Sequence, residues 1–414
     1  MDHHSHSFSL DEYALIIDNI ETSSRDTVRS MCLAHRSFVP LCQRILFQEV
    51  NFHPDKIGPF LNILKTSPHL ADYIHTFNFE LNHKSALRDS AGNTETVEAL
   101  SKLRRLRKLC VGCSYFWDFN SDWKKFDGEV CNALLRLMLL PGLRYLKLQR
   151  ISNFPLGGLL QLKKSPTLEA VELVVVEVAP TALLPVDPNI DVAGFPRRIS
   201  TLIDWGGNAT TTEVFLGGHI SPFDNDAVFD FTYLRKLHLC LCDEREARVG
   251  KLILKAAPRL EEFICESSRQ PRVGFDGIAD CILLGSFQSL RKLTLRTSEP
   301  KTIYNGVDTV SSFFSELQKL SGHLNCLENL VLNIVHYTTP YSHFLHLLRI
   351  VKARCNLVDE YLFADHRSFP ALSSLTVVAV LFFKDVLDRI RERTFLHMKA
   401  AQHPVDFRFQ VGFI

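Results

Sequence analysis

The sequence predicts an α/β protein in which a short helical segment precedes a long array of helix–strand repeats. Two observations predict this. Between residues 8 and 52, apolar residues recur at three- and four-residue spacing, which is typical of helices. Beyond Phe52, a line of the form Pro-x-Leu, followed by alternating apolar positions, recurs along the 414-residue chain.

The N-terminal segment is predicted to form three short helices. Ser9 and Glu12 have the spacing of a capping box, which starts the first helix. The second helix starts at Ser23 or Ser24, and Pro40 suits the first turn of the third. A unit of about 45 residues cannot enclose all of its apolar side chains. They are covered either by the rest of this chain or by another molecule, and both alternatives are open at this point.

The repeat line has five copies with proline and four without. Those with proline are SPHLADYIHTFNF at 67, LPGLRYLKLQ at 140, SPTLEAVELVV at 165, APRLEEFICE at 257 and FPALSSLTVV at 369. Proline ends the preceding helix, and the alternation turns one face of a strand inward. Stacked copies give a parallel sheet with outer helices. We expect an irregular leucine-rich-repeat-like solenoid over residues 53–414, with an irregular insertion at 179–218 that holds a degenerate strand near 212–216.

The composition excludes several classes of function. Lys and Arg number 47 against 46 Asp and Glu, so no global charge attracts nucleic acid or an anionic membrane. No secretory signal is recognisable, and the longest apolar run is too short to span a membrane. Eleven scattered cysteines are typical of a reducing compartment. We therefore expect a soluble cytoplasmic or nuclear protein that binds neither nucleic acid nor membrane.

Motifs for catalysis or metal binding are weak. Cys110 and Cys113 form a C-x-x-C pair without the second pair that structural zinc needs, so we expect them on and just after a strand. Nucleotide, metalloprotease and serine-hydrolase motifs are absent from the sequence. The basic run at 102–108 is interpreted as a solvated helix edge, in preference to a contact with nucleic acid or phosphate. We expect no metal, no cofactor and no enzymatic activity.

The segments FSLDEYALIIDNI and TVRSMCLAHRSFVPLCQRILFQEV resemble the F-box of fungal F-box proteins with leucine-rich repeats. The resemblance divides the chain into a flexible N-terminus at 1–7, an F-box at 8–52 and the solenoid at 53–414. F-box proteins are substrate receptors of SCF-type cullin-RING ubiquitin ligases. The resemblance implies that the F-box binds a Skp-type adaptor and, through it, cullin, while the repeats bind an unknown protein substrate. The alternative is a ligase-independent scaffold with a degenerate F-box.

The resemblance also implies which residues bind the adaptor. By position they are Phe8, Leu10, Leu15, Ile16, Ile20, Val28, Leu33, Arg36, Phe38, Ile45, Leu46, Phe47 and Val50. Strand residues that alternate with the buried leucines are predicted to line the substrate-binding face. Its polar members are Lys147, Gln149, Glu172, His238, Glu266, Thr294, Arg296 and Asn333.

Overall fold

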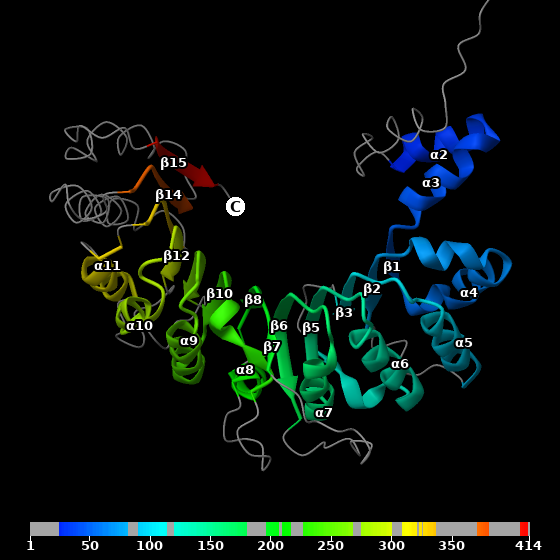
Figure 1. Ribbon diagram of the computed structural model, residues 1–414, viewed down its shortest axis with the longest axis horizontal. Helices are drawn as coiled ribbons and strands as arrows, with labels where there is room; N and C mark the ends of the chain where they lie inside the picture. Colours follow the sequence, from blue (N-terminus) through cyan, green and yellow to red (C-terminus); the bar gives the residue numbers. More distant parts are fainter. Residues whose placement is uncertain are drawn as a thin grey trace, which may run out of the picture. The chain divides into compact units, whose positions relative to one another are not determined.

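The computed structural model divides into two compact units. Unit 1 comprises residues 1–168 and 178–194, and unit 2 comprises residues 169–177 and 195–414. The described residues are 25–81, 90–113, 120–179, 196–206, 209–216, 227–267, 275–299, 309–320, 323–324, 326–336, 371–380 and 406–412. Both units contain parallel strands with helices packed beside them, so the predicted α/β class is confirmed (Figure 1).

The described part of unit 1 begins with two helices, which are followed by a parallel sheet. The helices are α2 (Arg25–Ala34) and α3 (Val39–Leu46). The strands are β1 (Glu49–Phe52), β2 (Thr76–Glu80), β3 (Lys108–Gly112), β4 (Ser121–Asp122) and β5 (Tyr145–Phe154), paired in the order β1-β2-β3-β5 with β4 beside β5. On one side of this sheet lie α4 (Ile57–Thr66), α5 (Ser90–Ser101), α6 (Gly128–Met138) and α7 (Leu156–Leu160) (Figure 1).

Unit 2 also combines a parallel sheet with helices. Its strands, in order across the sheet, are β6 (Ala170–Val178), β8 (Thr201–Asp204), β10 (Lys236–Leu241), β11 (Glu262–Ser267), β12 (Lys292–Glu299), β13 (Asn329–His336), β14 (Ser374–Val380) and β15 (Asp406–Gly412). Two short strands, β7 (Arg197–Arg198) and β9 (Phe229–Asp230), pair separately. The helices are α8 (Ala209–Phe215), α9 (Glu244–Ala256), α10 (Ile278–Gly285) and α11 (Thr309–Leu320).

The leucines of the repeat line form the core, as their alternation predicts. In the copy at 140, Leu143, Leu146 and Leu148 are completely buried. In FQSLRKLTLR, a copy without proline that starts at residue 287, the corresponding Leu290 and Leu293 are equally buried. Burying such a side chain stabilises the fold by about 1.5–3 kcal/mol relative to leaving it in water. Each strand therefore contributes its leucines to a layer between sheet and helices.

At the start of nine strands, two successive backbone N–H groups donate to one carbonyl of the preceding repeat. The Arg235 carbonyl accepts the N–H groups of both Glu261, at 2.8 Å, and Glu262, at 2.9 Å. The Glu261 carbonyl accepts those of Arg291 and Lys292 in the same way. Further carbonyls with this pattern belong to Gln48, His75, Arg107, Glu169, Ser200, Arg291 and Glu328. The repeat is thus visible in the backbone, including places where the leucine pattern is degenerate.

A hydroxyl side chain makes a second link between successive repeats. Ser289 Oγ lies 3.0 Å from the Pro258 carbonyl oxygen and 2.9 Å from the Leu260 carbonyl oxygen of the preceding repeat. Thr167 Oγ1 makes the equivalent two contacts in unit 1, at 2.7 and 2.8 Å. The turn that carries proline therefore also supplies acceptors for the next repeat.

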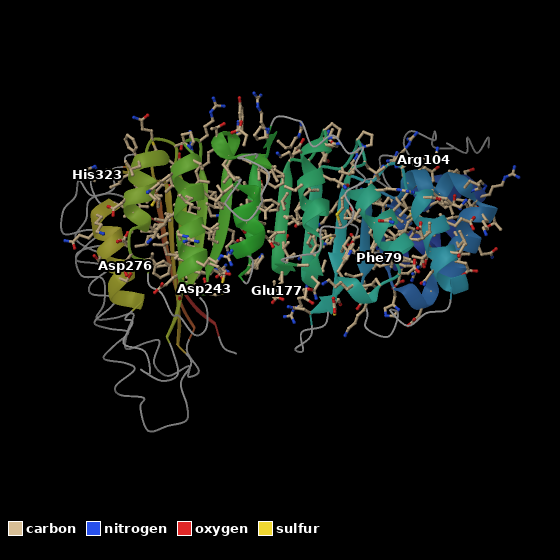
Figure 2. The ribbon with its side chains drawn as sticks, turned by 90° about the horizontal axis from the view of Figure 1, so that it is seen from below. Phe79, Arg104, Glu177, Asp243, Asp276 and His323 are labelled. Carbon is tan, nitrogen blue, oxygen red and sulfur yellow. The ribbon has the colours of Figure 1, made fainter. Side chains whose placement is uncertain are left out.

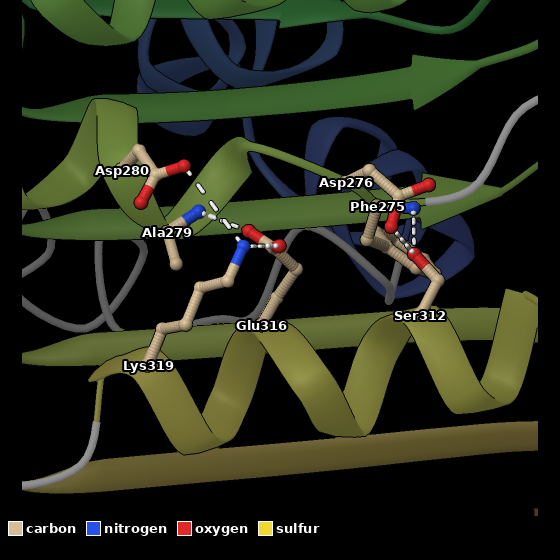
Figure 3. A network of polar contacts seen from close by, with 7 residues as sticks. All are labelled: Phe275, Asp276, Ala279, Asp280, Ser312, Glu316 and Lys319. Carbon is tan, nitrogen blue, oxygen red and sulfur yellow. Dashed lines mark hydrogen bonds and ion pairs between the residues drawn. The ribbon is translucent and has the colours of Figure 1, made fainter.

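Polar contacts between helices specify which repeats are neighbours. Helix α10 follows Gly277, which has a φ of 77° and no side chain to cap the helix. The adjacent α11 provides the acceptor instead, because Glu316 Oε2 accepts the Ala279 N–H at 2.7 Å (Figure 3). Ser312 of α11 accepts a backbone N–H just before α10. Lys319 Nζ lies 2.7 Å from Glu316 Oε1 and compensates the charge of this buried carboxylate.

The prediction of a strand near 212–216 is wrong. The segment near 212–216 was expected to be a strand, but it lies in helix α8, and the strand of this repeat is β8. The threonines that favour a strand by propensity are fixed by tertiary hydrogen bonds. Thr211 Oγ1 donates to the Val176 carbonyl at 2.9 Å, and Thr212 Oγ1 donates to Asp204 Oδ2 at 2.8 Å. Residues 196–206 and 209–216 of the expected irregular insertion therefore hold regular elements.

The sequence also predicts a helix over residues 344–353. This helix and the first N-terminal helix lie outside the described residues. The second and third N-terminal helices are α2 and α3, with Pro40 in the first turn of α3, as predicted.

The link through Ser289 gives a stability prediction. Ser289→Ala removes the hydroxyl and leaves two carbonyls without this donor, so the free energy of unfolding should fall by about 1 kcal/mol. Ser289→Thr should retain most of the stability of wild type, since Thr167 makes the same contacts at the equivalent position. Chemical denaturation measures both variants. Equal losses for the two variants would contradict the assignment.

Candidate interaction surfaces

The pair of helices α2 and α3 has a very small core of its own. Val28 and Cys42 are the residues of these two helices that are completely buried. The side chains packed around them are only partly buried: Met31, Cys32, Phe38, Leu41, Ile45 and Leu46. Each of these six side chains therefore keeps part of its surface exposed.

Leu33, near the end of α2, is the clearest case. Its exposed fraction is 89%, the highest of any large hydrophobic residue that the structure describes. The neighbouring Arg36 is also exposed. Exposed apolar side chains that lie close together mark interaction sites more often than isolated ones do.

Part of the helix pair contacts the rest of unit 1. His69 Nε2 lies 3.4 Å from Gln43 Oε1, which joins the 3₁₀ segment Pro68–Tyr73 to α3. Arg25 Nη2 donates to the Glu49 carbonyl at 3.3 Å. The pair is therefore attached to the sheet at β1, while Leu33 is left uncovered.

The predicted adaptor-binding residues fall into four groups. Leu33 and Arg36 are exposed, and Val28 is buried inside the pair, so it supports the surface without belonging to it. The half-buried members are Phe38, Ile45, Leu46, Phe47 and Val50, and Val50 lies in β1, not in a helix. Those outside the described residues are Phe8, Leu10, Leu15, Ile16 and Ile20.

A polar cluster lies on the sheet face of unit 2, on the strand positions that alternate with the buried leucines. Glu266 is at its centre. Its Oε1 lies 3.1 Å from His238 Nε2 and also pairs with Nη1 of Arg296. The Trp205 ring centroid is 4.3 Å from that of His238. We call Trp205, His238, Glu266 and Arg296 the sheet-face cluster.

The strand register extends this cluster onto β13. Glu266 is paired with Arg296, and Arg296 with Asn333, so these three side chains point to one face in neighbouring strands. Thr294 shares that face two positions earlier on β12. Five of the eight predicted substrate-binding residues thus gather in one region. The others are Lys147 and Gln149, on β5 of unit 1, and Glu172, on β6.

The sequence gives no signal for Trp205. It follows β8, a strand that the leucine pattern does not predict because Pro196 lies three residues, and not two, before the first apolar residue, which is Ile199 and not leucine. Trp205 is 37% exposed, whereas His238 is only 7% exposed. A half-exposed indole above a buried polar cluster is the kind of group that is enriched in binding hot spots.

Glu266 is ionised because of its neighbours. Burial acts to raise its pKa, but His238 and the charge of Arg296 outweigh burial and hold the pKa below the ordinary value. The carboxylate is therefore a fixed negative centre that orients His238 and Arg296 on the face.

This shift predicts a pH dependence of stability. An unfolded Glu titrates near about 4.3, so a lower folded pKa stabilises the protein above that pH, and the stabilisation is lost as pH falls through the folded pKa. Glu266→Gln should therefore lose less stability than wild type between about pH 6 and about pH 3 in denaturant titrations. Glu244→Gln, at an exposed site on α9, should follow wild type. Identical curves for wild type and Glu266→Gln would contradict the assignment.

The remaining chemical candidates form no site. Cys110 lies on β3 and Cys113 just after it, as predicted. Among the described residues, no group of three or more His, Cys, Asp and Glu side chains could hold a metal ion. The basic run at 102–108 is a turn leading into β3, not a helix edge, although Leu103 and Leu106 are buried.

No family model matches the chain, and no curated protein matches it. Across the described ranges, none of the helices has the length and apolar character needed to cross a membrane. Function must therefore be inferred from the surfaces themselves.

Proposed function

We propose that this protein is a substrate-recognition subunit of an SCF-type cullin-RING ubiquitin ligase. Its α2–α3 segment would be the part of an F-box that binds a Skp-type adaptor, and its repeat array would hold a protein substrate. The F-box resemblance of residues 8–50 motivates the proposal. The observation that carries it is the exposed Leu33 on a helix pair that has almost no core of its own.

The energetics favour a partner on this surface. A large aliphatic side chain left in water forfeits about 1.5–3 kcal/mol relative to burial. Leu33 and the half-buried Phe38, Ile45 and Leu46 therefore offer several kcal/mol to any molecule that covers them, before the cost of association. An aromatic and aliphatic patch of this kind suits a helical adaptor surface.

The sheet-face cluster supports the substrate-binding half of the proposal. It combines an exposed indole, a part-exposed guanidinium and fixed buried polar groups on rigid strands. Because these groups are held on rigid strands, their side chains lose little conformational entropy when a substrate binds. The receptor would act by placement alone, since holding a target near the charged ubiquitin-conjugating enzyme raises its effective concentration. No catalysis by this chain is required.

A ligase-independent scaffold is the second candidate. It is favoured by the contacts of Arg25 and Gln43, which attach the helix pair to the rest of unit 1. In that case the helix pair would cap the repeat array, and the sheet face would bind a structural partner.

Leu33→Asp separates the two functions. Capture of a purified Skp-type adaptor by the full chain should fall by at least about tenfold, because a carboxylate would be desolvated at the centre of the contact. Ile63→Asp is the matched control, since Ile63 is an exposed aliphatic residue of α4 outside the proposed surface. It should capture adaptor like wild type. Absence of capture by wild type itself would favour the scaffold.

A further inference from the structure

Two cysteines lie next to each other in unit 2, where β10 ends and α9 begins. Cys240 is near the end of β10, and Cys242 follows the strand. Their Sγ atoms are 3.9 Å apart, which is within hydrogen-bond distance for sulfur. Both residues are half-buried, whereas Cys265 on the neighbouring β11 is completely buried. A small soluble oxidant can therefore reach this pair in the folded protein.

The surrounding backbone leaves room for the two sulfurs. Gly206 has a φ of 79°, and a Cβ atom at this position would lie 2.7 Å from Cys242 Sγ and 3.6 Å from Cys240 Sγ. Glycine suits both the backbone conformation and the close approach to the thiols. The Cys242 N–H donates to Glu246 Oε2 at 2.6 Å, which attaches Cys242 to the first turn of α9. Figure 2 shows Asp243, the residue after Cys242, at the edge of unit 2 where its strands end.

The environment of Cys242 keeps it protonated. Its hydrogen bond with Cys240 raises its pKa above the ordinary thiol value, and burial and the charges of Cys240 and Glu246 raise the pKa further. A protonated Cys242 can donate its S–H to Cys240, and a hydrogen bond to the charged form of a group favours that form. Because the thiolate is the nucleophilic form of cysteine, this arrangement favours Cys240 as the attacking sulfur.

We propose that Cys240 and Cys242 are a redox-active dithiol that a hydroperoxide oxidises to a disulfide. The Cys240 thiolate first attacks one peroxide oxygen. The S–O bond forms, the O–O bond breaks, and with hydrogen peroxide the leaving hydroxide takes up the proton that Cys240 has lost and becomes water. The Cys242 sulfur then attacks the sulfenic acid sulfur of Cys240. The S–S bond forms, the S–O bond breaks, and the hydroxide leaves as water with the proton of Cys242.

The electrons and the reverse reaction are also accounted for. The two sulfurs together lose two electrons, which reduce one hydrogen peroxide to two water molecules. Two molecules of a thiol reductant such as glutathione return the pair to the dithiol by thiol–disulfide exchange and become a disulfide themselves. The proposal does not depend on ligase function.

Formation of the disulfide requires a movement of Cys242. The Sγ atoms must approach from 3.9 Å to about 2.05 Å. Cys240 is held in register opposite Glu266, whereas the paired residues of β10 end at Leu241. We therefore expect Cys242 to move towards Cys240, which weakens the hydrogen bond between the Cys242 N–H and Glu246.

This movement affects the sheet-face cluster. Trp205 directly precedes Gly206, and its ring centroid is 4.3 Å from that of His238. His238 lies two residues before Cys240 and therefore on the same face of β10. Since Cys242 Sγ lies next to Gly206, its displacement changes the packing beneath the turn that holds Trp205. Oxidation is thus expected to alter the contact between Trp205 and His238, whatever partner the sheet face binds.

A structural metal fits the pair less well. Structural zinc takes four protein ligands, and the described ranges hold no group of three or more His, Cys, Asp and Glu side chains that could bind a metal ion. The carboxylate that follows in sequence, Asp243, caps α9 instead, because its Oδ1 accepts the Glu246 N–H at 2.9 Å.

Mass spectrometry of the full chain tests the proposal. The folded protein is treated with hydrogen peroxide and unfolded, its remaining thiols are alkylated, and it is digested with trypsin. Cleavage after Lys236 and Arg245 places both cysteines in one peptide of residues 237–245. This peptide should lose two hydrogen atoms and escape alkylation at least about tenfold faster than Cys265 is oxidised, because Cys265 is buried. Dithiothreitol should restore both thiols.

Single serine variants separate the roles of the two sulfurs. Cys242→Ser should stop at the sulfenic acid of Cys240, which dimedone labels. Cys240→Ser should be labelled at Cys242 at least about tenfold less, because Cys242 keeps its proton beside Glu246. Cys110→Ser, at a half-buried strand position of unit 1, is the matched control and should form the disulfide of residues 240 and 242 at the wild-type rate. The wild-type disulfide remains a test if a serine variant fails to fold.

Tryptophan fluorescence tests the effect on the sheet-face cluster. Peroxide should shift the emission of wild type as the disulfide forms, and dithiothreitol should reverse the shift. Cys240→Ser should show no shift under the same treatment. Trp205→Phe should form the disulfide without the shift, which would assign the signal to Trp205.

Four results would overturn the proposal. These are the absence of a disulfide within the peptide of residues 237–245, oxidation of Cys265 at the same rate as the pair, and equal dimedone labelling of Cys240 and Cys242 in the two serine variants. The fourth is an unchanged emission of wild type after the disulfide has formed.

Discussion

The structure depends on the fact that one repeat cannot bury its own leucines. Each strand presents a row such as Leu146 and Leu148 to the helix side, and these side chains are enclosed only when neighbouring repeats are in place. The shared carbonyls fix the position of each strand against the previous one, and links such as Ser289 and Glu316 add side-chain specificity. Rigid faces that can carry binding groups follow from this stacking.

The N-terminal helix pair is the exception to this rule. It is attached to β1, but Val28 and Cys42 are its completely buried residues, and Leu33 is almost fully exposed. Within the repeats, leucines such as Leu146 and Leu148 are enclosed by neighbouring units, although Leu252 and Leu284 on the helices are exposed as well. A partner that covers the exposed apolar side chains of the pair would provide the burial that neighbouring repeats provide elsewhere in the chain. We propose that this partner is the adaptor.

The sequence predicts the strands well where their pattern is strong. Alternating leucines identify β5, β10, β11 and β12, and the face that carries His238 and Glu266 follows from period two. Prediction from the sequence fails where tertiary contacts determine the secondary structure. Helix α8 forms from threonines that are fixed by Asp204 and the Val176 carbonyl. The contact of Trp205 with His238 and the geometry of the cluster depend on strand register, which the sequence does not show.

Hydrogen–deuterium exchange of the full chain, with and without a purified Skp-type adaptor, tests the central claim most directly. If the exposed apolar surface of the helix pair is an adaptor site, the adaptor should slow exchange in α2, α3 and the segment around Leu33, while the strands of unit 2 exchange as before. Unchanged exchange in α2 and α3 at saturating adaptor would contradict the account.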